Sequence, residues 1–140
     1  MFDAEELMSD FKVIQDGPPD ARVKLLLERT VERFHESLAA ITRLVEQPFE
    51  GKTVVVTHHL PSPACVAPEY KNDRLTPAFA SNLDAFIEQH PQIAYFLHGH
   101  THSSVDVMVA STRVLCNPGG FPHGGRRENR AFEIECVFQL

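Results

Sequence analysis

Two short apolar runs, residues 53–57 and 93–97, are the clearest indication of the fold of this chain. The first reads Thr-Val-Val-Val-Thr and is apolar on both faces, which is typical of a central strand covered on both sides. The second predicts another short buried strand. Residues 77–89 between them have the apolar spacing of a helix. Strand, helix and strand form a βαβ unit with parallel strands and a right-handed crossover, so we expect an α/β fold.

Both apolar runs lead directly into histidines. His58 and His59 follow the first run, and His98, His100 and His102 follow the second. Parallel strands end at the same edge of their sheet, where ligands bind in open α/β sheets. Neutral imidazole is the commonest metal ligand, so histidines from both strand ends are expected to meet around one ion. His100 and His102, two residues apart, can point to the same side of an extended chain.

Other roles for these histidines stay open at this point. The motif around residue 100 is also compatible with a surface loop that happens to be rich in histidine. His59 is favoured as part of a turn, and His98 is favoured as a hydrogen-bonded histidine of the core.

The remaining elements are expected from the period of the apolar residues. From residue 21 to about 46 they recur at steps of three and four, which predicts an amphipathic helix capped by Asp20. Alternation over 105–109, followed by 113–116, predicts a hairpin that turns at Ser111-Thr112. Further expectations are a short helix within 1–10, a strand over 11–14, long loops over 60–76 and 117–130, and a half-buried final strand over 131–138.

Composition excludes several classes of protein. The 140 residues match one domain, and 43% of them are hydrophobic, which is enough for a core. A formal net charge of −6 argues against a nucleic-acid backbone as partner. Cys65, Cys116 and Cys136 form no CxxC pair, so neither a disulfide framework nor a thiolate zinc site is indicated. With no membrane span or signal peptide in the sequence, we expect a soluble cytoplasmic protein with reduced thiols.

At its histidine motifs the sequence resembles the calcineurin-like metallophosphoesterases. Val-Val-Val-Thr-His-His at 54–59 matches the family's strand that ends in a ligand histidine, and Gly-His-Thr-His at 99–102 matches its Gly-His-x-His motif. Asn-Pro-Gly-Gly at 117–120 is similar to the C-terminal end of the family. Met-Ser-Asp-Phe at 8–11 resembles the approach to this half in some bacterial members. The likeness spans nearly the whole chain.

The resemblance implies a metal-dependent phosphoesterase whose full site holds two divalent transition metal ions (Mn, Fe or Zn). By this likeness His58 and His100 would hold one ion and His102 the other. The family's Asp-x-His, Gly-Asp-x-x-Asp and Asn-His motifs do not occur in the chain. The chain therefore resembles the C-terminal half of the family: a single, incomplete domain over 1–140, forming a partial two-sheet sandwich with flanking helices.

The missing motifs limit the expected chemistry. Three neutral imidazoles without a bridging carboxylate should hold one ion rather than a close pair, because two nearby cations repel. We expect little or no hydrolysis by this chain alone, with no complete catalytic set in it. The expected partners are a phosphoester substrate or a missing N-terminal half.

Two alternatives to an enzyme remain, a non-catalytic metal- or partner-binding fragment and a truncated reading frame. The Gly-rich loop that carries Arg126, Arg127 and Arg130 is either a contact for an anionic substrate or a solvated surface.

Overall fold

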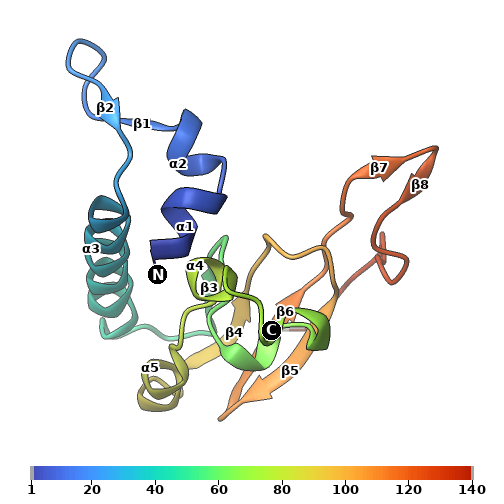
Figure 1. Ribbon diagram of the computed structural model, residues 1–140. Helices are drawn as coiled ribbons and strands as arrows, with labels where there is room; N and C mark the ends of the chain where they lie inside the picture. Colours follow the sequence, from blue (N-terminus) through green and yellow to red (C-terminus); the bar gives the residue numbers. More distant parts are fainter. Residues whose placement is uncertain (1, 140) are drawn as a thin grey trace. The chain divides into compact units, whose positions relative to one another are not determined.

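The computed structural model describes residues 2–139 in two compact units, which divide between Leu44 and Val45. The α/β class expected from the sequence is confirmed, and no helix within 2–139 has the length and apolarity to cross a membrane. The first unit holds α1 (Phe2–Leu7), α2 (Asp10–Val13), β1 (Gln15–Asp16), β2 (Val23–Lys24) and α3 (Leu27–Val45) (Figure 1). The second holds β3 (Thr53–Val56), η1 (Pro63–Cys65), η2 (Pro68–Tyr70), α4 (Thr76–Phe79), α5 (Asp84–Gln89), β4 (Ile93–Leu97), β5 (Val105–Val109), β6 (Thr112–Cys116), β7 (Pro122–His123) and β8 (Arg126–Arg127).

In the first unit, α3 begins at Leu27 and not at residue 21. The residues before it form the antiparallel hairpin of β1 and β2, which turns at Gly17 with a φ of 99°. The carboxylate of Glu5 accepts a hydrogen bond from the Leu27 backbone N–H at 2.9 Å. Glu5 therefore satisfies an N–H at the helix start, the role that the sequence assigns to Asp20.

The predicted strand over 11–14 is wrong, because these residues lie in and just after the helix α2. The backbone N–H of Val13 donates to the Ser9 carbonyl at 3.0 Å, and that of Ile14 donates to the Asp10 carbonyl at 2.9 Å. Phe11 is the buried residue of this helix. Four residues are too few for a period to separate helix from strand, and the helix is the conformation in which Phe11 is buried.

The second unit is built on a four-stranded sheet with the order β3-β4-β6-β5. β3 and β4 pair in parallel, with Val55 opposite Phe96, which confirms the predicted βαβ unit. β5 and β6 form the predicted antiparallel hairpin, but it turns at Ala110-Ser111 and not at Ser111-Thr112, because Thr112 pairs with Val109. β6 also pairs in parallel with β4, placing Phe96 opposite Val114. The side chains of Phe96 and Val114 are fully buried. The core of this unit is therefore centred on β4 and β6.

The sequence predicts a central position for β3, but the strand lies at the edge of the described sheet. Its residues differ in burial, because Val55 is buried whereas Val56 is 68% exposed. A continuous apolar run predicts that the side chains of a strand are buried, but it does not determine whether one or two strands pair with it.

The crossover between β3 and β4 holds two short helices where the sequence predicts one helix over 77–89. After α4 the chain extends alongside the loop that follows β3. The Leu60 backbone N–H donates to the Phe79 carbonyl at 3.0 Å, and the Ser81 N–H donates to the Leu60 carbonyl at 2.9 Å. Leu60 is fully buried. These tertiary hydrogen bonds replace helical ones and interrupt the predicted helix.

The predicted strand over 131–138 is not formed. The side chain of Asn117 donates to the Glu133 carbonyl at 2.7 Å and accepts from the Glu133 N–H at 3.1 Å. An amide side chain thus takes the place of a neighbouring strand at Glu133. Beyond it, Ile134 and Val137 are 84% and 87% exposed, so the alternating pattern does not bury one face. The loop predicted over 117–130 contains the short β7–β8 hairpin.

Candidate metal centre

The loops that follow β3 and β4 are joined where these parallel strands end. The sheet pairing continues through the Thr57 N–H, which donates to the Leu97 carbonyl at 3.0 Å, and the Gly99 N–H, which donates to the His58 carbonyl at 3.0 Å. His58 and the segment around His100 therefore lie beside each other, as the sequence predicts for histidines at neighbouring strand ends.

Three imidazoles form a group at this edge of the sheet. His58, His59 and His100 each contribute one ring nitrogen, and these nitrogens lie within 4.8 Å of one another. Nδ1 of His100 is 3.3 Å from Nε2 of His58. In a tetrahedral zinc site with Zn–N bonds of about 2.0–2.1 Å, two ligand nitrogens are about 3.3–3.4 Å apart. The spacing of this pair fits that requirement and also lies within hydrogen-bonding distance.

Ring contacts orient the three imidazoles. Phe79, from the end of α4, stacks on the His100 ring with centroids 5.0 Å apart and an angle of 30° between the planes. The His59 and His100 rings meet edge to face at 4.8 Å, and the His58 and His100 rings do so at 5.2 Å. His58 and His59 are exposed and His100 is half-buried. An ion can therefore reach the group from solvent.

The backbone of His100 explains how its ring joins this group. Its φ of 68° lies in the left-handed region, which is uncommon for residues other than glycine. Gly99 before it is not left-handed, and a Cβ at Gly99 would lie 3.5 Å from Nδ1 of His58, an ordinary contact. The turn at the site is therefore made by His100, and strain of this kind is typical of functional positions.

Of the three ligands implied by the resemblance, His58 and His100 come together, whereas His102 lies outside their group. Nδ1 of His102 is 2.7 Å from the carboxylate of Glu128, which belongs to the C-terminal loop. His59, which the sequence favours as a turn residue, is the third member of the group. Its signal in the sequence was its position directly after His58 at a strand end.

His98 lies in the core, as expected, but its hydrogen bonding is incomplete within the described structure. It is 8% exposed, and its Nδ1 lies 3.1 Å from the Gly99 carbonyl. Because a carbonyl only accepts, Nδ1 carries the proton in this contact. Nε2 is buried without a hydrogen-bond partner among residues 2–139. Burial lowers the pKa of His98, because the charged form would lose its hydration.

The two buried cysteines of the second unit do not add thiolate ligands to the group. Cys65 and Cys116 are both buried. Burial raises the pKa of the Cys65 thiol to about 11 and also raises that of Cys116. Both thiols are therefore protonated near neutral pH, whereas a metal is bound by the thiolate.

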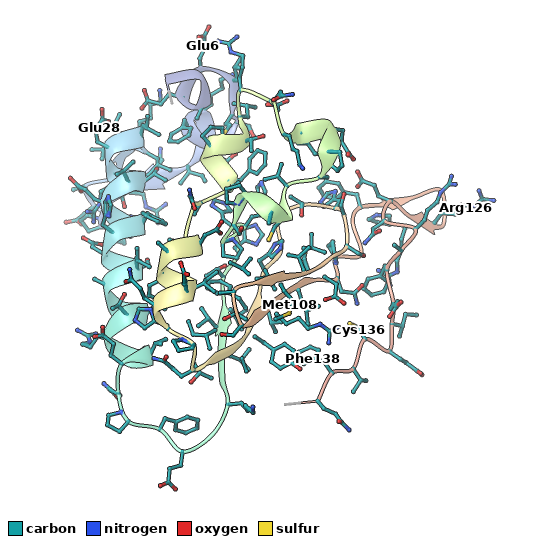
Figure 2. The ribbon with its side chains drawn as sticks, turned by 90° about the horizontal axis from the view of Figure 1, so that it is seen from below. Glu6, Glu28, Met108, Arg126, Cys136 and Phe138 are labelled. Carbon is teal, nitrogen blue, oxygen red and sulfur yellow. The ribbon has the colours of Figure 1, made fainter. Side chains whose placement is uncertain are left out.

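The arginines of the C-terminal loop do not form one cationic pocket. Arg126 is exposed at the end of the β7–β8 hairpin, and its side chain points away from the sheet (Figure 2). The guanidinium of Arg127 lies 4.3 Å from the centre of the Phe132 ring. Arg130 is exposed.

No family model matches the chain, and no curated protein or solved structure gives a significant match.

Proposed function

We propose that the chain binds one divalent transition metal ion through His58, His59 and His100, and that this centre serves phosphoester hydrolysis. The observation that carries the proposal is the 3.3 Å spacing between ring nitrogens of His58 and His100 at the ends of two parallel strands. The likeness of both histidine motifs to those of the calcineurin-like metallophosphoesterases supports the choice of reaction.

The protein's own contribution is to present three neutral nitrogens from two linked loops. Phe79 supports the His100 ring, and the hydrogen bond from Gly99 to the His58 carbonyl holds the loops together. When bound to these imidazoles, a divalent ion would lower the pKa of a coordinated water toward 7 and would stabilise charge on phosphoryl oxygens. The exposure of His58 and His59 leaves room for a phosphoester to approach.

We further propose that the chain corresponds to the C-terminal half of a two-sheet metallophosphoesterase sandwich. The N-terminal half would then supply the bridging carboxylate and the histidine that protonates the leaving group. A general acid typically contributes about 10²–10⁴-fold to the rate. The chain alone should therefore hydrolyse phosphoesters very slowly or not at all.

The chemistry of the ligand group favours a second candidate, a metal-binding fragment without catalysis. All three members are imidazoles and bring no negative charge. Two cations about 3.5–4 Å apart, as in two-metal hydrolysis, repel each other strongly unless an anion bridges them. A single ion on this group has no second ion to stabilise the leaving oxygen.

Hydrolysis of an aryl phosphate separates the two candidates. The purified chain is stripped with a chelator, reloaded with Mn, Fe or Zn, and assayed alone and with an added polypeptide that carries the family's N-terminal motifs. The phosphoesterase proposal predicts turnover that depends on this polypeptide, is lost in His58→Ala and is retained in His35→Ala. His35 is an exposed histidine on α3 and serves as the matched control.

Two other outcomes of this assay are informative. Metal binding without turnover, even with the N-terminal polypeptide, would favour the non-catalytic candidate. Metal-dependent turnover by the chain alone, abolished in His58→Ala, would show that a complete catalytic site is present and that the ligand set is larger than the three imidazoles.

A further inference from the structure

His102 and Glu128 form a pair whose proton positions follow from elementary chemistry. Nδ1 of His102 lies 2.7 Å from Oε2 of Glu128. An ionised carboxylate can only accept a hydrogen bond, so Nδ1 is the donor. When the imidazole is neutral, its single proton is then on Nδ1 and its lone pair is on Nε2.

The carboxylate is held in place by the loop that carries it. The Phe121 backbone N–H donates to the same Oε2 at 3.1 Å, and the Glu128 backbone N–H donates to the Phe121 carbonyl at 3.1 Å. The ring of Phe121 meets the His102 ring edge to face with centroids 4.7 Å apart. Gly120 before it has a φ of 67°, and a Cβ there would lie 2.8 Å from Cβ of Glu128. Only glycine fits this approach without displacement.

Asn129, the residue after Glu128, fixes this loop to the rest of the second unit. It is 7% exposed, and its Nδ2 donates to the Ser104 hydroxyl at 2.9 Å and to the Pro118 carbonyl at 2.7 Å. Its Oδ1 accepts from the Ala131 N–H at 3.0 Å. Ser104 lies in the segment that follows the Gly-His-Thr-His motif. Asn129 therefore links the backbone segment that carries Glu128 to the segment that carries His102.

We infer that Glu128 is a positioning residue for His102 of the Gly-His-Thr-His motif: it fixes the tautomer and the orientation of this ring, so that Nε2 carries the lone pair. That is the form in which a histidine binds an ion or takes up a proton. Carboxylates that accept the second N–H of a functional histidine play this part in many metal sites. The functional use of Nε2 rests on the proposed function, whereas the tautomer itself is a property of the metal-free chain.

Ring ¹⁵N NMR of the ¹⁵N-histidine-labelled, metal-free chain at pH 8 tests this inference. The His102 signals are assigned by their loss in His102→Gln. We expect His102 to be mainly in the Nδ1–H tautomer in the wild-type chain, and its Nε2–H fraction to rise in Glu128→Ala and in Glu128→Gln. Glu135→Ala, an exposed carboxylate in the same C-terminal segment, should leave the His102 tautomer unchanged.

The wild-type spectrum decides the question even if a variant disturbs the loop. A wild-type His102 that is mainly Nε2–H would overturn the inference, and so would an unchanged tautomer in both Glu128 variants. Because no metal or substrate is present, this result is independent of whether His58, His59 and His100 bind an ion. A failure of the positioning role is therefore distinguishable from a failure of the proposed function.

Discussion

The support that Asn129 gives to the C-terminal loop can be measured as stability. Asn129→Ala removes three hydrogen bonds of a residue that is only 7% exposed. At about 1 kcal/mol net for each bond, the variant should lose about 3 kcal/mol of the free energy of unfolding. The Pro118 carbonyl and the Ala131 N–H lose their partner, which places the loss at the upper end for a polar substitution.

Urea unfolding of Asn129→Ala, compared with wild type at a fixed m-value, measures this loss directly. Asn72→Ala, an exposed asparagine in the loop before α4, is the control and should change the free energy of unfolding by no more than about 0.5 kcal/mol. Hydrogen exchange of the Ala131 amide should become faster in Asn129→Ala. A loss below about 0.5 kcal/mol with an equally protected Ala131 amide would refute the assignment of Asn129 as the support of this loop.

Three further predictions concern titration and reactivity. Imidazole binds metal only when neutral, so acidification should release the bound metal; metal retained at pH 4.5 would point to other ligands. A thiol reagent at pH 8 should modify the exposed Cys136 first and reach Cys65 (pKa about 11) and Cys116 only on unfolding, whereas equal rates for all three would contradict their burial. Burial lowers the pKa of His98 in the folded chain, so on acidification the unfolded chain binds this proton at a higher pH than the folded chain does. The metal-free chain should therefore lose stability as the pH falls below about 6.5, by at most about 1.4 kcal/mol per pH unit for one proton. His98→Gln should flatten that slope, and an identical slope in the variant would refute the assignment.

Strands of the sheet could be predicted where the period of the apolar residues matches the burial of their side chains in the structure. β4 and β5 have the predicted bounds, and the pairing of β3 with β4 follows from the crossover between them. The errors fall where a tertiary contact overrides the local pattern. Residues 80–83 leave the helical conformation to pair with the loop at Leu60, and Asn117 takes the place of a strand neighbour beside residue 133. Neither contact has a signal in the local sequence.

The candidate centre was predictable in its location but not in its full membership. Strand ends and imidazole chemistry predict that histidines following the two strands meet at one edge of the sheet, and the resemblance selects His58, His100 and His102 among them. The pairing of His100 with His102 assumed an extended chain, in which residues two apart share a side. The left-handed φ of His100 breaks that alternation, and His102 contacts Glu128 instead. The chain bends after β3, which allows the neighbour of His58 to join the group.

Calorimetric titration of the metal-free chain with Zn²⁺ at pH 7.5 measures whether His58, His59 and His100 hold an ion. We expect one ion per chain. Loss of any one of the three grouped histidines should weaken binding by at least about tenfold, since even the outer partners of ligands contribute 10–100-fold. His102→Ala and His35→Ala should leave the affinity within about threefold, because both side chains lie outside the group. A stoichiometry of two, an absence of binding, or a loss in His102→Ala as large as in His100→Ala would contradict a centre formed by His58, His59 and His100.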